Sequence, residues 1–202
     1  MASAPMRDRP RLPVHVFRRF VEGRPEEERW ELIDGVAVMM APPTLAHQII
    51  AGNLQRLLND ALEIRLPTLV ACQRAGVNIG PLVEHFDPEP DVIVIDTETA
   101  EKPGERYADR FYLAAEIVSS SERTYVESKR EIYKLHDACK YILTIQQDRV
   151  DVRIDLRAEA GWNEELLTGL GDPLVLAEFG LRCKVWDVYR GTSLAPRQAA
   201  RH

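Results

Sequence analysis

Four consecutive β-branched residues, Val92 to Ile95, stand between Asp91 and Asp96. This run does not alternate apolar and polar side chains, so it is typical of a strand that is buried in a sheet. A strand of this kind needs helices packed over its sheet, and the chain has helical patterns before and after it. We therefore expect an α/β or α+β fold, in which helices flank a mixed β-sheet.

Three segments have the spacing of helices. Pro13 can occupy the first position of a short helix, and Thr44 can cap a long helix that Pro67 ends. A further helix is predicted from about 122 to 138. The long helix carries an apolar stripe at three-to-four spacing, formed by Leu45, Ile49, Ile50, Leu54, Leu57, Leu58, Ala61 and Leu62.

The strands are predicted from short apolar runs and from turn residues. Asp34-Gly35 separates the runs 30–33 and 36–40 and predicts a β-hairpin, because both residues tolerate the positive φ of a type I′ turn. A segment at 164–170 is expected to pair behind the later strands, and the last ordered piece is expected to end near 186–189. The other predicted strands are 68–72, 76–79, 91–96, 111–118, 141–145 and 150–156.

The chain of 202 residues suits one domain, which can bury its core without disulfide or metal staples. We expect a loose N-terminal arm over 1–12, a single domain over 13–190 and a flexible tail over 191–202. The three cysteines are far apart, so they predict no disulfide framework and no zinc site. No membrane span or secretory signal is evident, and we expect a cytoplasmic protein.

Charge is distributed unevenly along the chain. Lysine and arginine total 26 against 32 aspartates and glutamates, a formal net charge of −6, and the segment 84–109 alone carries a net charge of −7. This balance excludes a broadly basic coat for nucleic acid. It is compatible with a nuclease, whose site must be acidic to hold a metal. The arginines of the first 24 residues are candidates for phosphate contacts, and a basic arm without that role is an equal alternative.

Glu116 is unusual because it interrupts an apolar strand. Period two places it on one face of the strand with Tyr112, Ala114 and Val118. A carboxylate buried there must be paired or bound to a metal. A structural ion pair and a functional site are equally good explanations.

Asp91 and Lys129 are the other two candidates. Asp91 stands at the head of the buried strand, where it can face a cleft at the rim of the sheet or belong to a solvated turn. Lys129 is expected on or beside an inward helix face, while Arg130 and Lys134 can look outward. An exposed lysine is the commoner case. The other members of that inward face are Val126, Tyr133 and His136.

These three residues together resemble the PD-(D/E)XK nuclease superfamily, and the whole chain is similar to the Uma-two family of restriction-endonuclease-like proteins. The resemblance implies a restriction-endonuclease-like core. It runs from about residue 12 to residue 190 and is carried by Trp30-Glu-Leu-Ile-Asp-Gly35, Met39-Met-Ala-Pro-Pro43 followed by His47, Pro90-Asp-Val-Ile-Val-Ile95, Ala115-Glu-Ile-Val-Ser119, Lys129-Arg-Glu-Ile-Tyr133 and Lys140-Tyr-Ile-Leu143.

The resemblance also implies roles for individual residues. Asp91 and Glu116 match the two metal-binding acids, with Mg²⁺ or Mn²⁺ as the expected cofactor. The superfamily pattern places a lysine two positions after the second acid, where this chain has Val118. In the Uma-two family the lysine comes from the next helix instead, and Lys129 matches that position. Two further matches, with less defined roles, are the early acid Glu31 and the helix histidine His47.

This set predicts a metal-dependent endonuclease that hydrolyses phosphodiester bonds of DNA. A divalent ion can neutralise the phosphate and activate water, and a lysine can stabilise developing charge or, if deprotonated, orient the water. The alternative is a catalytically inactive nuclease-fold module that binds nucleic acid or a protein partner, because position 118 lacks the lysine and the chain is acidic. The resemblance also makes a homodimer an expectation.

Overall fold

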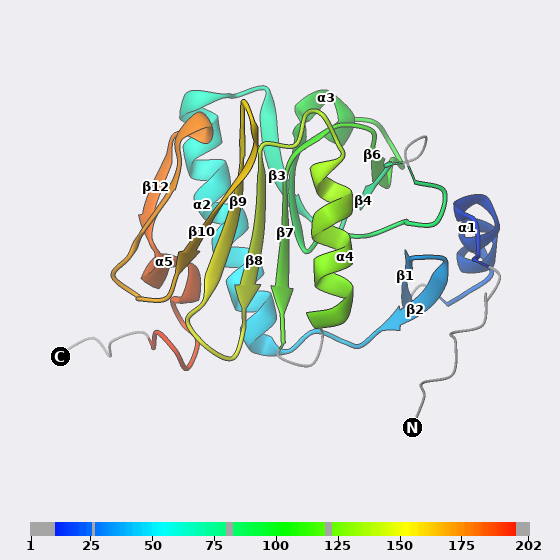
Figure 1. Cartoon of the computed structure of the whole chain (residues 1–202), viewed down its shortest axis with the longest axis horizontal. Helices are drawn as coiled ribbons and strands as arrows, with labels where there is room; N and C mark the ends of the chain where they lie inside the picture. Colours follow the sequence, from blue (N-terminus) through cyan, green and yellow to red (C-terminus); the bar gives the residue numbers. More distant parts are fainter. Residues whose placement is uncertain (1–10, 26, 80–82, 120–122, 197–202) are drawn as a thin grey trace.

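The computed structural model describes residues 11–25, 27–79, 83–119 and 123–196 (Figure 1). Most of the predicted arm and part of the predicted tail lie outside these residues, so the domain boundaries stay a prediction. The helices are α1 (Val14–Glu22), α2 (Leu45–Arg65), α3 (Thr97–Ala100), α4 (Arg123–Lys134), the 3-10 helix η1 (Ala177–Phe179) and α5 (Val185–Tyr189). The strands are β1 (Arg29–Ile33), β2 (Val36–Met40), β3 (Leu69–Gln73), β4 (Gly76–Val77), β5 (Val92–Asp96), β6 (Tyr107–Ala108), β7 (Phe111–Val118), β8 (Tyr141–Gln146), β9 (Val152–Ala158), β10 (Gly161–Leu167), β11 (Pro173–Leu176) and β12 (Leu181–Lys184).

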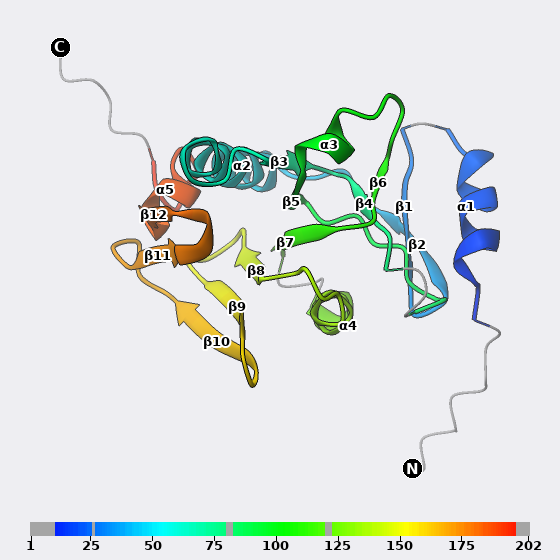
Figure 2. The ribbon, with the colours of Figure 1, turned by 90° about the horizontal axis from the view of Figure 1, so that it is seen from above.

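A six-stranded sheet forms the centre of the fold, with the strand order β10-β9-β8-β7-β5-β3. β7 and β8 run parallel and the other neighbours run antiparallel, so the sheet is mixed. Parallel strands need a crossover, and α4 supplies it on one face while α2 covers the other (Figure 2). This architecture confirms the predicted fold class. None of the described helices is long and apolar enough to cross a membrane.

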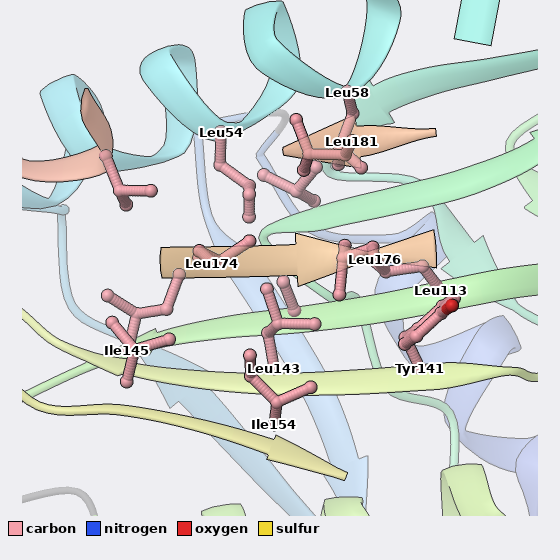
Figure 3. Close-up of a cluster of buried hydrophobic side chains, with 14 of the residues drawn as sticks. Leu54, Leu58, Leu113, Tyr141, Leu143, Ile145, Ile154, Leu174, Leu176 and Leu181 are labelled. Atoms are coloured by element: carbon pink, nitrogen blue, oxygen red, sulfur yellow. The ribbon is translucent and has the colours of Figure 1, made fainter. Parts of the chain in front are cut away.

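The face under α2 holds the larger hydrophobic cluster, and the predicted helix stripe supplies much of it. The stripe begins one turn later than predicted, because Leu45 and Ile49 are 78% and 37% exposed. Each leucine that leaves water here contributes roughly 1.5–3 kcal/mol. The side chains labelled in Figure 3 are Leu54, Leu58, Leu113, Tyr141, Leu143, Ile145, Ile154, Leu174, Leu176 and Leu181.

Several short elements differ from the predicted ones. The hairpin of β11 and β12, followed by α5, covers the α2 face and was not predicted. The strand predicted at 164–170 starts earlier, as β10, and pairs antiparallel with β9 at the edge of the sheet. The strand predicted at 76–79 is shortened to β4, which pairs with β6. Short pieces of this kind depend on partners that are distant in the sequence, so local patterns define them poorly.

A β-bulge changes the predicted face of β7. Val94 lies opposite Leu113 and Ile95 opposite Phe111, so Tyr112 is an extra residue on β7. Beyond the bulge, alternation places Ala114 in the cluster under α4, whereas Tyr112 packs against the cluster under α2. The prediction that Tyr112 shares a face with Ala114 and Glu116 is therefore wrong, because an inserted residue reverses the alternation.

α4 lies over the second hydrophobic cluster and differs from the prediction in two respects. It ends at Lys134 rather than near 138. Arg130 does not look outward: it is buried and makes two hydrogen bonds, of 2.7 and 2.9 Å, to the buried carboxylate of Asp155 on β9. An arginine fork matches a carboxylate in this geometry, so the pair fixes α4 to the sheet.

The β1–β2 hairpin forms around Asp34 and Gly35 as predicted, with φ of 50° and 76°. A side chain at Gly35 is excluded on two grounds, because its φ is positive and a Cβ there would lie 2.5 Å from Cβ of Arg11. An isolated β-bridge between Leu32 and Asp87 ties the hairpin to the acidic segment before β5. This connection holds β1 close to the end of the central sheet that carries Asp91.

Candidate active site

All five residues that the sequence singled out line one cavity of about 420 Å³. Glu31 comes from β1, His47 from α2, Asp91 from the position before β5, Glu116 from β7 and Lys129 from α4. β5 and β7 are neighbours in which Val92 lies opposite Ala115, and this register brings Asp91 beside Glu116 at one end of the sheet. The structure thus brings the candidates together, while their chemical roles stay predictions.

Lys129 is buried between two glutamates. Its Nζ lies 2.8 Å from Oε1 of Glu116 and 3.0 Å from Oε2 of Glu31. Burial alone would lower the pKa of Lys129, but the two carboxylates outweigh burial and raise that pKa above its ordinary value of 10.5. Lys129 is therefore an ammonium. The charged form is the one that could stabilise negative charge, and the catalytic role of Lys129 stays a prediction.

Burial raises the pKa of Glu116, whereas it acts to lower the pKa of Lys129. Loss of hydration raises the pKa of this carboxyl from 4.5 to about 7, although the nearby ammonium of Lys129 favours the charged form. The negative charges of Asp91 and Glu31 add to the increase. Glu116 is thus held in a position where its charge is unfavourable unless a further cation arrives.

Two hydrogen bonds hold the glutamates in place, and sequence reasoning assigned neither. The hydroxyl of Tyr133 donates to Oε1 of Glu116 at 2.6 Å, and the backbone N–H of Glu89 donates to Oε1 of Glu31 at 3.2 Å. The available signal for Tyr133 was its position one helical turn after Lys129, on the same face of α4. Oε2 of Glu31 is also buried, and it lies 3.0 Å from Nζ of Lys129.

Asp91 is held from two sides. Its Oδ2 accepts the backbone N–H of Ile117 at 2.8 Å, and its Oδ1 lies 3.1 Å from Nε2 of His47. Burial alone would raise the pKa of Asp91, but His47, the charge of Lys129 and the Ile117 N–H together outweigh burial and hold that pKa below its ordinary value of 3.8. Thr44 fixes the start of α2 near His47, because its Oγ1 accepts the His47 N–H and donates to Gln147 after β8.

The rest of the cavity wall is mostly apolar. It is formed by β2 with the segment that follows it, and by the first turns of α4. Arg29 also lines the cavity, and its guanidinium contacts the carboxylate of Glu89 at 3.3 Å. The apolar members of the wall include Val38, Met39, Met40, Pro42, Pro43, Tyr125 and Val126.

The donor chemistry of this site suits a divalent metal. Carboxylate oxygens are the ligands that Mg²⁺ and Mn²⁺ prefer, and Asp91 and Glu116 present them to the same cavity. The buried carboxylate of Glu31 lines the same cavity and offers further oxygen atoms. In the described part of the chain, no three His, Cys, Asp or Glu residues are grouped around one metal position. The ammonium of Lys129 instead lies between Glu31 and Glu116.

The structure has a mixed sheet flanked by helices, with one acid directly before β5, a second acid on β7 and a lysine on α4. This is the arrangement that the resemblance implies for a restriction-endonuclease-like protein. The family model Uma2, described as "Putative restriction endonuclease", matches residues 15–185. The chain therefore belongs to the Uma2 family, as the resemblance predicted.

A solved structure supports the fold independently. It is the crystal structure of a "putative nuclease belonging to DUF820" from Anabaena variabilis ATCC 29413. The TM-score is 0.68 at 16% sequence identity, over 84% of this chain and 94% of that chain. At this identity the match shows the fold alone. No curated protein matches the sequence.

Proposed function

We propose that this protein is a metal-dependent endonuclease that hydrolyses phosphodiester bonds of DNA. The observation that carries the proposal is the convergence of Asp91, Glu116, Lys129 and Glu31 on one cavity, in a chain of the Uma2 family. These residues come from separate parts of the fold, and all of them are buried although they are charged. Burying charged groups is unfavourable, so their assembly at a cavity supports a role in chemistry.

The proposed roles follow from the chemistry of each group. Asp91 and Glu116 would hold a Mg²⁺ or Mn²⁺ ion, which supplies charge neutralisation and an activated water when bound. The ammonium of Lys129 would stabilise the negative charge that develops on the phosphate. His47 orients Asp91 through Oδ1, and Tyr133 orients Glu116 through Oε1. Glu31 keeps the lysine ammonium at the cavity.

The test compares two aspartates of the same strand region. The three proteins are the wild type, Asp91→Asn and the control Asp96→Asn. Each is titrated by calorimetry with Mg²⁺ and Mn²⁺, with and without a short DNA duplex, and is assayed for cleavage of that duplex. Asp96 ends β5, accepts a hydrogen bond from the Tyr112 hydroxyl and does not line the cavity. We expect metal binding and metal-dependent cleavage in the wild type and in Asp96→Asn, and neither in Asp91→Asn.

Undiminished cleavage by Asp91→Asn would remove this assignment. Absence of metal binding in the wild type, with and without DNA, would favour the inactive nuclease-fold module. One observation supports that second candidate: the ammonium of Lys129 already satisfies part of the charge of Glu31 and Glu116. DNA binding without metal would then distinguish a nucleic-acid module from a protein-binding one. The homodimer stays a prediction, since the structure is of a single chain.

A further inference from the structure

The proposed catalytic groups lie at the bottom of the cavity and not on an open surface. Glu31, Lys129, Glu116 and Asp91 are only 1%, 3%, 5% and 8% exposed. A phosphate must therefore leave the surrounding water and enter the cavity to reach them. The paired strands of a duplex form a stiff helix, so an intact duplex must be deformed before one of its phosphates can enter such a recess.

The size of the cavity suits one nucleotide. Its volume of about 420 Å³ lies at the small end of the range for pockets that enclose a single small molecule. A nucleotide in this space must be unpaired and unstacked, as it is in enzymes that extrude a nucleotide from the helix before they act on it.

The mouth of the cavity offers surfaces that fit a base. Met39 on β2 and Tyr125 on α4 line the cavity and are 60% and 45% exposed. Aromatic side chains stack on the bases of single strands whatever the sequence, and a methionine provides an adaptable apolar contact. Pro42 and Pro43 extend the same apolar wall.

Among the residues that the structure describes, the cavity offers few free cations for a duplex backbone. Each basic side chain that lines it already contacts an acid: Lys129 contacts Glu116 and Glu31, Arg29 contacts Glu89 and His47 contacts Asp91. Recognition of a duplex depends on many phosphate contacts from lysine and arginine. The described wall is instead apolar beside the acids, so base contacts must supply much of the binding energy.

We infer that the substrate of this site is an unpaired DNA strand, which places one nucleotide in the cavity and stacks a base on Tyr125. The inference rests on the proposed function and narrows its substrate class. A paired duplex would have to open locally before it could be cut. A strand end, a flap or a mismatched bubble would require less opening.

Two measurements on the full chain test this inference. The first compares cleavage in Mg²⁺ or Mn²⁺ of one labelled DNA strand, alone and annealed to its complement. The second measures fluorescence anisotropy of a labelled 12-nucleotide thymidine strand in Ca²⁺, alone and annealed to its complement, with the wild type, Tyr125→Ala, Tyr125→Phe and Leu135→Ala. Leu135 is half exposed, follows α4 and does not line the cavity, so it is the matched control.

We expect the single strand to be cut at least about tenfold faster than the duplex. Tyr125→Ala should weaken strand binding roughly tenfold, the ~1.4 kcal/mol that fits one lost stacking contact. Tyr125→Phe keeps the ring and Leu135→Ala leaves the cavity intact, so both should bind like the wild type. Tyr125 is exposed enough that the variants should fold, and circular dichroism would check this.

Equal or faster cleavage of the duplex would overturn the inference and leave the proposed function intact. Unchanged strand binding by Tyr125→Ala would also overturn it. If neither substrate is cut in either metal, the proposed function fails. In that case, preferential binding of the single strand over the duplex would still support the inference, as a binding preference of the cavity. Equal binding of strand and duplex would overturn the inference together with the proposed function.

Discussion

Replacing Lys129 with methionine keeps an unbranched side chain, one atom shorter, and removes its charge. In the folded protein this leaves Glu31 and Glu116 buried without the ammonium that lies about 3 Å from each of them. Removing one partner of a buried ion pair typically costs about 3–5 kcal/mol, because the other charge stays buried and unpaired. For a domain of this size such a loss lowers the melting temperature by roughly 6–20 °C.

The effect should depend on pH with a defined sign. The pKa of Lys129 is raised in the folded state, so its contribution is fully present below its ordinary value of 10.5. Without Lys129 the carboxyl of Glu116, whose pKa is already raised to about 7, binds its proton still more tightly in the folded state. Such a group destabilises the fold as the pH rises, so the variant should recover stability as the pH falls from 8 to 5.

The assay is thermal denaturation in EDTA at both pH values, so that no metal ion contributes. The control is Lys134→Met, the same change further along α4. Lys134 pairs at 2.8 Å with the exposed carboxylate of Glu131 and lies 3.4 Å from the buried carboxylate of Asp155. Asp155 keeps its two hydrogen bonds from Arg130 in this variant, so the loss of Lys134 should cost only about 1 kcal/mol. If Lys129→Met melts with the wild type at pH 8, or loses stability equally at both pH values, then Lys129 is not the buried counter-ion of the two glutamates.

Two further substitutions test the surroundings of the site. Tyr133→Phe removes the 2.6 Å hydrogen bond to Glu116 and should lower stability by about 1–3 kcal/mol in thermal denaturation, and an unchanged melting temperature would contradict that hydrogen bond. Arg130→Met leaves the buried carboxylate of Asp155 without its arginine and should lose about 3–5 kcal/mol in urea denaturation. A loss below about 1 kcal/mol, as expected for the partly exposed Arg153→Met, would show that the pair is not buried in solution.

The parts of the fold that sequence reasoning predicted are those with strong local signals. The β-branched run of β5 needs only its own composition to indicate a buried strand. The β1–β2 hairpin depends on two adjacent residues, Asp34 and Gly35, whose conformational range selects the turn. The apolar stripe of α2 follows most of this 21-residue helix, long enough to define a face even though its first turn is exposed.

The parts that were missed depend on contacts between distant residues. The bulge at Tyr112 follows from how β7 registers against β5, which no local pattern records. The helical spacing allowed Arg130 to look outward, and its partner Asp155 lies 25 positions away on β9. The hydroxyl of Tyr133 could be placed on the inward face of α4, but its bond to Glu116 required the packing of the helix on the sheet.

The position of the lysine depends on that same packing. A lysine at position 118 would share a strand with Glu116, so the strand itself would fix their separation. Lys129 belongs to another element and reaches Glu116 only if α4 keeps its place over β7. Two side chains that follow Lys129 hold α4 on the sheet: Arg130 bonds to Asp155 on β9, and Tyr133 bonds to Glu116 on β7. A lysine on a helix thus needs buried polar side chains that hold the helix in place, and a lysine on the strand would not. This need accounts for the two consecutive buried cations of α4, Lys129 and Arg130.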